Sequence, residues 1–302
     1  MAFLKPSRTL IVIAFLLFSV QSALAKTYFE DKPGSCKIFG DTDVYGIGIR
    51  LGYYLQWVAV LFATWIAPEQ AKTARTAANI ITVAVFANTF RGAQEGSLVA
   101  AEWWIVLWLT FVLSLLNIPD DWKRSSSSFG VMLILWCMIT AAQPWLYFKG
   151  LDTGHKHGCV VKVFFFTGIN VYNHVWRTFW KVGSVVECLL GVTFFFTGIV
   201  VIIVGLFSVD ESSEPESGAA KIASKLFLTF GQLVTGIITI VQVEMTIRVN
   251  SIDLSSVDLM SSGQLIPFLI GCLTIAAVFG HGLKKLVQKL RRGDSPMGSG
   301  GA

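Results

Sequence analysis

Apolar stretches of membrane-crossing length recur along this chain, separated by shorter polar segments. A helix that crosses the hydrocarbon core of a bilayer needs about 20 mostly apolar residues, and charge-poor stretches of that kind are typical of transmembrane helices. After an N-terminal apolar segment, seven such stretches occupy residues 44–285. We therefore predict an all-α fold, a polytopic transmembrane bundle of about seven spans, at Val44–Ile66, Thr76–Thr89, Trp103–Ile118, Val131–Phe148, Ser184–Phe207, Leu226–Met245 and Leu265–Val278.

The second stretch is the least apolar of the seven. Asn79, Asn88 and Arg91 interrupt it, and such side chains are costly in contact with lipid. We expect a short or tilted helix that is covered by its neighbours.

The N-terminal apolar segment has the pattern of a secretory signal. Lys5 and Arg8 precede an apolar core at Leu10–Val20, and Ala23-Leu24-Ala25 forms a small-residue cleavage site. Residues 1–25 are therefore predicted to be a cleavable signal peptide. The alternative is an uncleaved anchor, for which this core is short. Cleavage would leave residues 26–43 as a lumenal or extracellular segment.

An external N-terminus and an odd number of spans predict a cytoplasmic C-terminus. The basic residues near that end favour the same orientation, and residues 286–302 then form a basic cytoplasmic tail. The expected location is the secretory pathway or the plasma membrane. The external loop between the fourth and fifth spans is also basic. Its polar residues recur at helical spacing, which predicts an amphipathic helix on the membrane surface, at Asn170, His174, Arg177 and Lys181.

Composition leaves little room for anything besides this bundle. Of the 302 residues, 54% are hydrophobic and 14% are charged, and the mean hydropathy is +0.64. The net charge of +5 forms no long basic run outside the C-terminal region, so nucleic acid is not an expected partner. The motifs of phosphate loops, zinc proteases and serine hydrolases are missing from the sequence, and no motif predicts a cofactor. The expected partners are the lipid bilayer and a small molecule.

The five cysteines divide into two groups. Three lie inside predicted spans, whereas Cys36 and Cys159 lie in loops on the same predicted side. An oxidising compartment favours a disulfide between these two, and two free thiols are the alternative. His155, His157 and Cys159 alternate along one segment, but a structural zinc site needs about four ligands. We predict no metal site.

Charged residues inside predicted spans are the strongest indication of a functional site. They are Arg50, Glu187, Glu244 and Arg248. Glu244 and Arg248 are one helical turn apart, so an ion pair within the helix is the simplest expectation. The alternative is that all four converge, together with Gln232 of the sixth stretch, on one polar cavity.

The sixth stretch carries polar residues on one helical face. The residues of this stripe are Gln232, Thr235, Thr239 and Gln242. They must avoid lipid, and two explanations remain open: hydrogen bonds to neighbouring helices, or a path lined by water.

Tryptophans fall at the ends of predicted spans. Trp103, Trp104, Trp122 and Trp145 occupy such positions, which is typical of an interfacial aromatic belt. The alternative is that some of them line a ligand pocket.

Two segments resemble a group of fungal polytopic membrane proteins of unassigned activity. The first is Asp43-Val44-Tyr45-Gly46-Ile47-Gly48-Ile49-Arg50 and the second is Ser262-Gly263-Gln264-Leu265-Ile266-Pro267. The resemblance implies a multi-span fold and no catalytic residues. Gly46 and Gly48 would let the chain bend at the membrane surface. Pro267 would break no hydrogen bond in the first turn of the last span.

The sequence favours non-enzymatic handling of a small solute or signal, by a transporter, channel or sensor. One alternative is a membrane enzyme acting on a lipid or terpenoid substrate, with Glu187 or Glu244 as proton donor. Another is a scaffold whose contacts lie in its loops.

Overall fold

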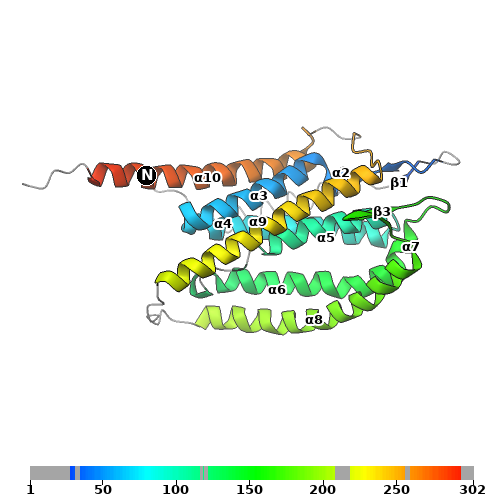
Figure 1. The fold of residues 1–302 in the computed structure, drawn as a ribbon, viewed down its shortest axis with the longest axis horizontal. Helices are drawn as coiled ribbons and strands as arrows, with labels where there is room; N and C mark the ends of the chain where they lie inside the picture. The colour runs from blue at the N-terminus through cyan, green and yellow to red at the C-terminus, as the bar shows by residue number, and fades with distance from the viewer. Residues whose placement is uncertain are drawn as a thin grey trace, which may run out of the picture.

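Seven long helices run side by side in the computed structural model, with their connections at the two ends of the bundle (Figure 1). The structure describes residues 28–30, 35–115, 118, 122–207, 218–255 and 259–293. The predicted signal peptide, residues 1–25, lies outside these ranges, as does the tail from residue 294. Each long helix overlaps one predicted span, which confirms the all-α bundle. They are α3 (Ile47–Ile66), α4 (Pro68–Gln94), α5 (Ala100–Leu115), α6 (Trp122–Trp145), α8 (His174–Phe207), α9 (Gly218–Val249) and α10 (Ser262–Gly293).

The short elements gather at one end of the bundle, which we call the disulfide end (Figure 1). Two antiparallel strand pairs lie there, β1 with β2 and β3 with β4. The elements at this end are β1 (Tyr28–Phe29), β2 (Ile38–Phe39), α2 (Thr42–Tyr45), the π-helix η1 (Leu146–Gly150), α7 (Leu151–Thr153), β3 (Lys162–Phe165) and β4 (Thr167–Asn170).

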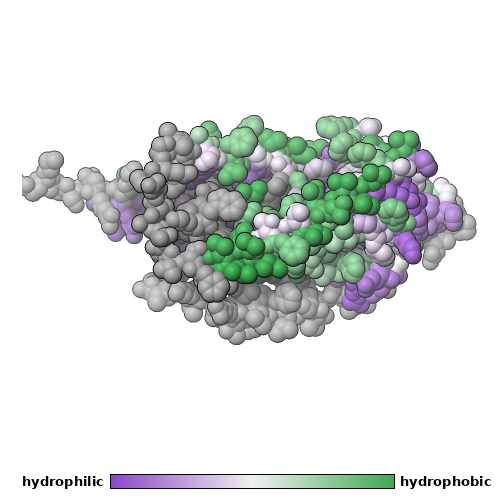
Figure 2. Space-filling model, turned by 90° about the horizontal axis from the view of Figure 1, so that it is seen from below, coloured by the Kyte–Doolittle hydropathy of each residue, from purple (hydrophilic) through white to green (hydrophobic). Residues whose placement is uncertain are grey.

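Five helices, α3, α6, α8, α9 and α10, are long and apolar enough to cross a membrane. Hydrophobic side chains cover the middle of the molecule, and hydrophilic side chains gather towards the disulfide end (Figure 2). Most of the apolar surface of α8 is exposed, for example at Phe196 and Val200. A helix that is apolar on its exposed faces is suited to lipid contact. By length and composition, these five helices of the described chain are therefore suited to cross a membrane.

The remaining two long helices are enclosed by others. On α5, Ala101, Ile105 and Leu109 are fully buried. On α4, Arg75 and Asn79 are buried as well. A helix surrounded by protein need be neither long nor strongly apolar. The expectation that neighbours cover the second stretch is confirmed, but the expectation of a short helix is wrong, because α4 has 27 residues.

Helices α3 and α10 approach closely along a glycine seam. A Cβ atom at Gly48 would lie 2.4 Å from the Gln264 carbonyl oxygen, and one at Gly52 would lie 2.6 Å from that of Pro267. The Gly48 N–H also donates to Gln264 Oε1 at 3.0 Å. Residues 43–50 and 262–267 therefore pack against each other. Gly46 separates α2 from α3, which confirms the expected bend there.

Two sequence expectations about helix starts were wrong. Pro267 is the sixth residue of α10, so it lies beyond the first turn. Because proline has no N–H, the Gly263 carbonyl oxygen, four residues earlier, loses its usual helical donor. The polar residues 170–181 do not form a separate surface helix. Asn170 ends β4, and α8 runs unbroken from His174 through the apolar stretch. Residues 174–181 are helical, as their spacing indicated. No strong helix breaker separates them from the apolar stretch, so both belong to one helix.

The glycine seam predicts a position-dependent effect of added volume. Gly52→Val places a branched side chain against the α10 backbone, and overpacking of this kind costs about 1–3 kcal/mol. Gly280→Val makes the same change on α10 where no neighbouring atom lies within 4 Å. Thermal unfolding of the two variants in detergent should show a lower midpoint for Gly52→Val. Equal midpoints would contradict the seam.

Candidate functional site

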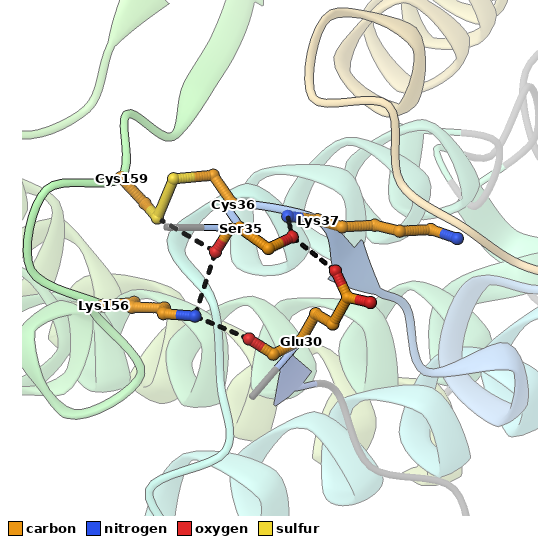
Figure 3. The surroundings of a disulfide bond; sticks show 6 residues. All are labelled: Glu30, Ser35, Cys36, Lys37, Lys156 and Cys159. Atoms are coloured by element: carbon orange, nitrogen blue, oxygen red, sulfur yellow. Dashed lines mark hydrogen bonds between the residues drawn. A yellow bond between two sulfur atoms is a disulfide. The ribbon is translucent and has the colours of Figure 1, made fainter. Parts of the chain in front are cut away.

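The N-terminal segment is fastened to the disulfide end by a covalent bond. Cys36 and Cys159 form a disulfide, with their Cα atoms 5.4 Å apart, as the sequence predicted. Lys156 lies beside it and donates to the carbonyl oxygens of Glu30 at 2.6 Å and Ser35 at 2.9 Å (Figure 3). The segment therefore stays attached to the bundle whether or not the chain is cleaved before it.

A third segment, the loop after α9, joins the same assembly. Gly40 N–H donates to the Asp253 carbonyl oxygen at 2.9 Å, and Asp253 N–H donates to that of Ile38 at 2.8 Å. Lys37 Nζ lies 2.8 Å from Asp253 Oδ2. Hydrogen bonding to Lys37 and Ser255 holds the pKa of Asp253 well below its usual range. Three distant segments thus meet at this end.

The histidines beside the disulfide do not form a metal centre in the described part of the chain. Cys159 is oxidised and cannot offer a thiolate. The ring centroid of His155 lies 3.8 Å from that of Tyr172, and burial lowers the pKa of His155.

One charged residue of α3 meets one of α9, whose side chain is about 45% exposed. Arg50 is buried and forms an ion pair with Glu244, and the Tyr54 hydroxyl donates to Glu244 Oε1 at 2.9 Å. Glu244 is thus paired with a residue of another helix, and the expected pair with Arg248 is not the one formed. Arg50 is far away in sequence, so spacing along α9 gave no indication of this partner.

The polar stripe of α9 faces the protein. Gln232, Thr239 and Gln242 are buried, as expected. The Trp57 indole N–H donates to the Gln232 carbonyl oxygen at 3.0 Å, beside Gly236. Thr239 Oγ1 and Gln242 Oε1 have no hydrogen-bond partner among the described residues. Hydrogen bonds between helices therefore explain only part of the stripe.

A cavity between α5, α6 and α8 has a volume of about 370 Å³. Among the described residues that line it, Glu187 is the only ionisable one. Gly191, one turn along α8, lets α6 approach closely, since a Cβ there would lie 2.2 Å from Thr140 Oγ1. The lining is largely aromatic and comprises Trp104, Leu107, Trp108, Thr110, Phe111, Trp136, Ile139, Thr140, Gln143, Phe165, Trp180, Glu187, Leu190 and Phe194.

Unpaired hydrogen-bond donors surround this cavity. Trp104, Trp108, Trp136 and Trp180 each bury an indole N–H that finds no acceptor in the described ranges. All four line the cavity. The four nitrogen atoms are themselves fully buried and do not face the open volume, so the carbon atoms of the indole rings form this part of the lining.

Glu187 also lacks a partner, since no residue in the described part of the chain forms a hydrogen bond or ion pair with it. Lys181, on the same helix, directs its Nζ to the Phe148 ring, 5.2 Å from the centroid. Tyr147 stacks on Trp180 at 5.6 Å.

The five predicted site residues do not share one cavity. The structure joins Arg50 to Glu244, places Gln232 farther along α9 against Trp57, and puts Glu187 in the α5–α6–α8 cavity. Arg248 belongs to neither group. The sequence reasoning missed Trp108 and Phe111, which follow Trp104 at helical spacing. The alternative role of Trp104, lining a pocket, is the one that the structure supports.

No known protein family, curated protein or solved structure matches this chain.

A second pair of acidic groups lies at the disulfide end. Asp41 caps α2 by accepting from Asp43 N–H at 2.9 Å, and Glu102 accepts from Val99 N–H at 3.0 Å at the start of α5. Asp41 N–H also reaches Glu102 Oε1 at 3.4 Å. Burial, and then the charge of Glu102, raises the pKa of Asp41 to about 8.

The raised pKa of Asp41 predicts that the folded protein loses stability as the pH rises. Because its pKa is raised, the folded protein favours the protonated acid. That stabilisation is fully present below its ordinary value of 3.8 and is lost as pH rises through about 8. Asp41→Asn keeps a capping oxygen but cannot ionise, so its unfolding midpoint should fall less between pH 5 and 8.5. Identical pH profiles for the variant and the wild type would contradict the assignment.

Proposed function

We propose that this multi-pass membrane protein binds a small amphipathic molecule in the α5–α6–α8 cavity and handles it without chemical change, as a transporter, channel or sensor does. The observation that carries the proposal is a cavity lined by aromatic rings from three helices that also holds a carboxylate, Glu187, without a partner among the described residues. The volume of about 370 Å³ falls in the usual range of ligand pockets, about 300–1,000 Å³.

The proposed ligand reaches the cavity through the bilayer. Helix α8 forms one wall of the cavity. It is the most exposed of the five helices that could cross a membrane, because only 11% of its most apolar 18-residue segment is buried. The cavity therefore lies one helix away from lipid. A molecule that partitions into the membrane needs no path through water to reach it.

The proposed orientation has seven crossings, with the disulfide end in the lumen or outside the cell. A disulfide persists in an oxidising compartment, which supports this side for Cys36 and Cys159. Lys284, Lys285 and Arg291 lie towards the C-terminal end of α10, at the opposite end of the bundle (Figure 1), where the positive-inside bias favours cytoplasm. A signal peptide at residues 1–25 and residence in the secretory pathway or plasma membrane complete the proposal. The contact between the two segments that resemble fungal polytopic proteins supports a shared multi-span fold and assigns no activity.

An enzyme acting on a lipid or terpenoid is the second candidate, and the same cavity favours it. Aromatic faces stabilise positive charge, and Glu187 is the single acid available as proton donor. Lipid extracts of cells that carry the wild type or Glu187→Gln separate the candidates. A product that disappears with the variant supports the enzyme, whereas unchanged extracts support binding without chemistry.

Filling the cavity should abolish ligand binding. The neutral dye N-phenyl-1-naphthylamine, added to the purified protein in maltoside detergent, should accept excitation energy from the cavity tryptophans in a saturable way. Leu107→Trp should weaken this binding at least about tenfold, which corresponds to about 1.4 kcal/mol. Leu273→Trp is the control, because Leu273 is 68% exposed on α10. Equal dye affinity in the two variants would contradict the proposed site.

A further inference from the structure

The unpaired carboxylate in the cavity indicates the charge of the ligand. We infer that the α5–α6–α8 cavity selects an amphiphile with one positive charge, an organic amine or quaternary ammonium with an apolar body. This inference rests on the proposed function and names its ligand class.

The first step concerns Glu187. A charged side chain in a membrane-spanning helix is costly unless it is paired or hydrated. Arg50 is already committed to Glu244, Lys181 points at Phe148, and Arg177 pairs with Asp152. In the described part of the chain, no basic side chain forms an ion pair with Glu187. A cationic ligand supplies the missing charge, whereas an anionic ligand is repelled.

The second step concerns the aromatic rings. On α8, Trp180, Glu187 and Phe194 recur every seventh residue, so they share one helical face. Trp136 of α6 lies against Phe194, with ring centroids 5.6 Å apart. Trp104 of α5 lies at the same distance from Trp180. Indole and phenyl rings from three helices thus lie two helical turns before and after Glu187 along the cavity. The faces of such rings attract a desolvated cation.

The third step concerns the rest of the lining. Leu107, Phe111, Ile139 and Leu190 are apolar, so the remainder of the ligand must be apolar as well. The same molecule therefore needs a positive head for Glu187 and an apolar body for the rest of the lining.

Equilibrium dialysis with two matched probes tests the inference. The labelled probes are 4-phenylbutyltrimethylammonium and 4-phenylbutanol, which share an apolar body and differ in charge. The protein is the full chain in neutral maltoside micelles, and Leu107→Trp measures the micelle background. The wild type should bind the cation at least about tenfold more tightly than the alcohol, and Glu187→Gln should reduce that ratio to below about threefold. Glu95→Gln is the control, because it removes an exposed carboxylate outside the cavity.

The possible outcomes separate the two proposals. Loss of cation preference in Glu187→Gln alone supports the inference. Equal binding of both probes that Leu107→Trp removes and Glu187→Gln leaves unchanged overturns the charge selection but keeps the site. Binding of neither probe above the Leu107→Trp background overturns the proposed function itself. A thermal unfolding midpoint of Glu187→Gln close to that of the wild type shows that the variant is folded.

Discussion

Polar groups inside a bilayer must find partners within the protein, because lipid offers none. This constraint organises the described helices. Arg75 and Asn79 of α4 are buried by neighbouring helices, the glutamines of α9 face inward, and Arg50 crosses from α3 to meet Glu244. The α5–α6–α8 cavity departs from this pattern, since it holds a carboxylate, Glu187, that the described part of the chain leaves unpaired. The proposed ligand is the partner that the constraint calls for.

The disulfide end contributes to the cavity as well as to the fold. Phe165 of β3 lines the cavity, and the strand is held from the other side by Asn250, which accepts from Lys162 N–H at 2.8 Å. The preceding loop is fastened to the N-terminal segment through Cys159. The position of one aromatic wall therefore depends on contacts among segments that are far apart in sequence.

Hydropathy was sufficient to predict the seven helices, because lipid-facing and buried helices are both largely apolar. The span predicted from hydropathy was shorter than α4. A helix covered by protein tolerates polar residues, and those residues lower the hydropathy from which the span was predicted. The disulfide was predictable because only two cysteines lie outside the apolar stretches. The partner of Glu244 was not, because a contact between α3 and α9 leaves no trace in local spacing. The cavity was missed for the same reason: Trp104 fits an aromatic belt equally well until α8 is placed beside it.

The central claim is that the space beside Glu187 holds a molecule that the protein binds. The most direct measurement is a cryo-electron microscopy map of the protein purified with its native lipids from the cells that produce it. We predict density between the Glu187 carboxylate and the Trp108 indole that the polypeptide does not account for. A map in which α5, α6 and α8 pack without a cavity, with aromatic side chains filling the space, would contradict the account.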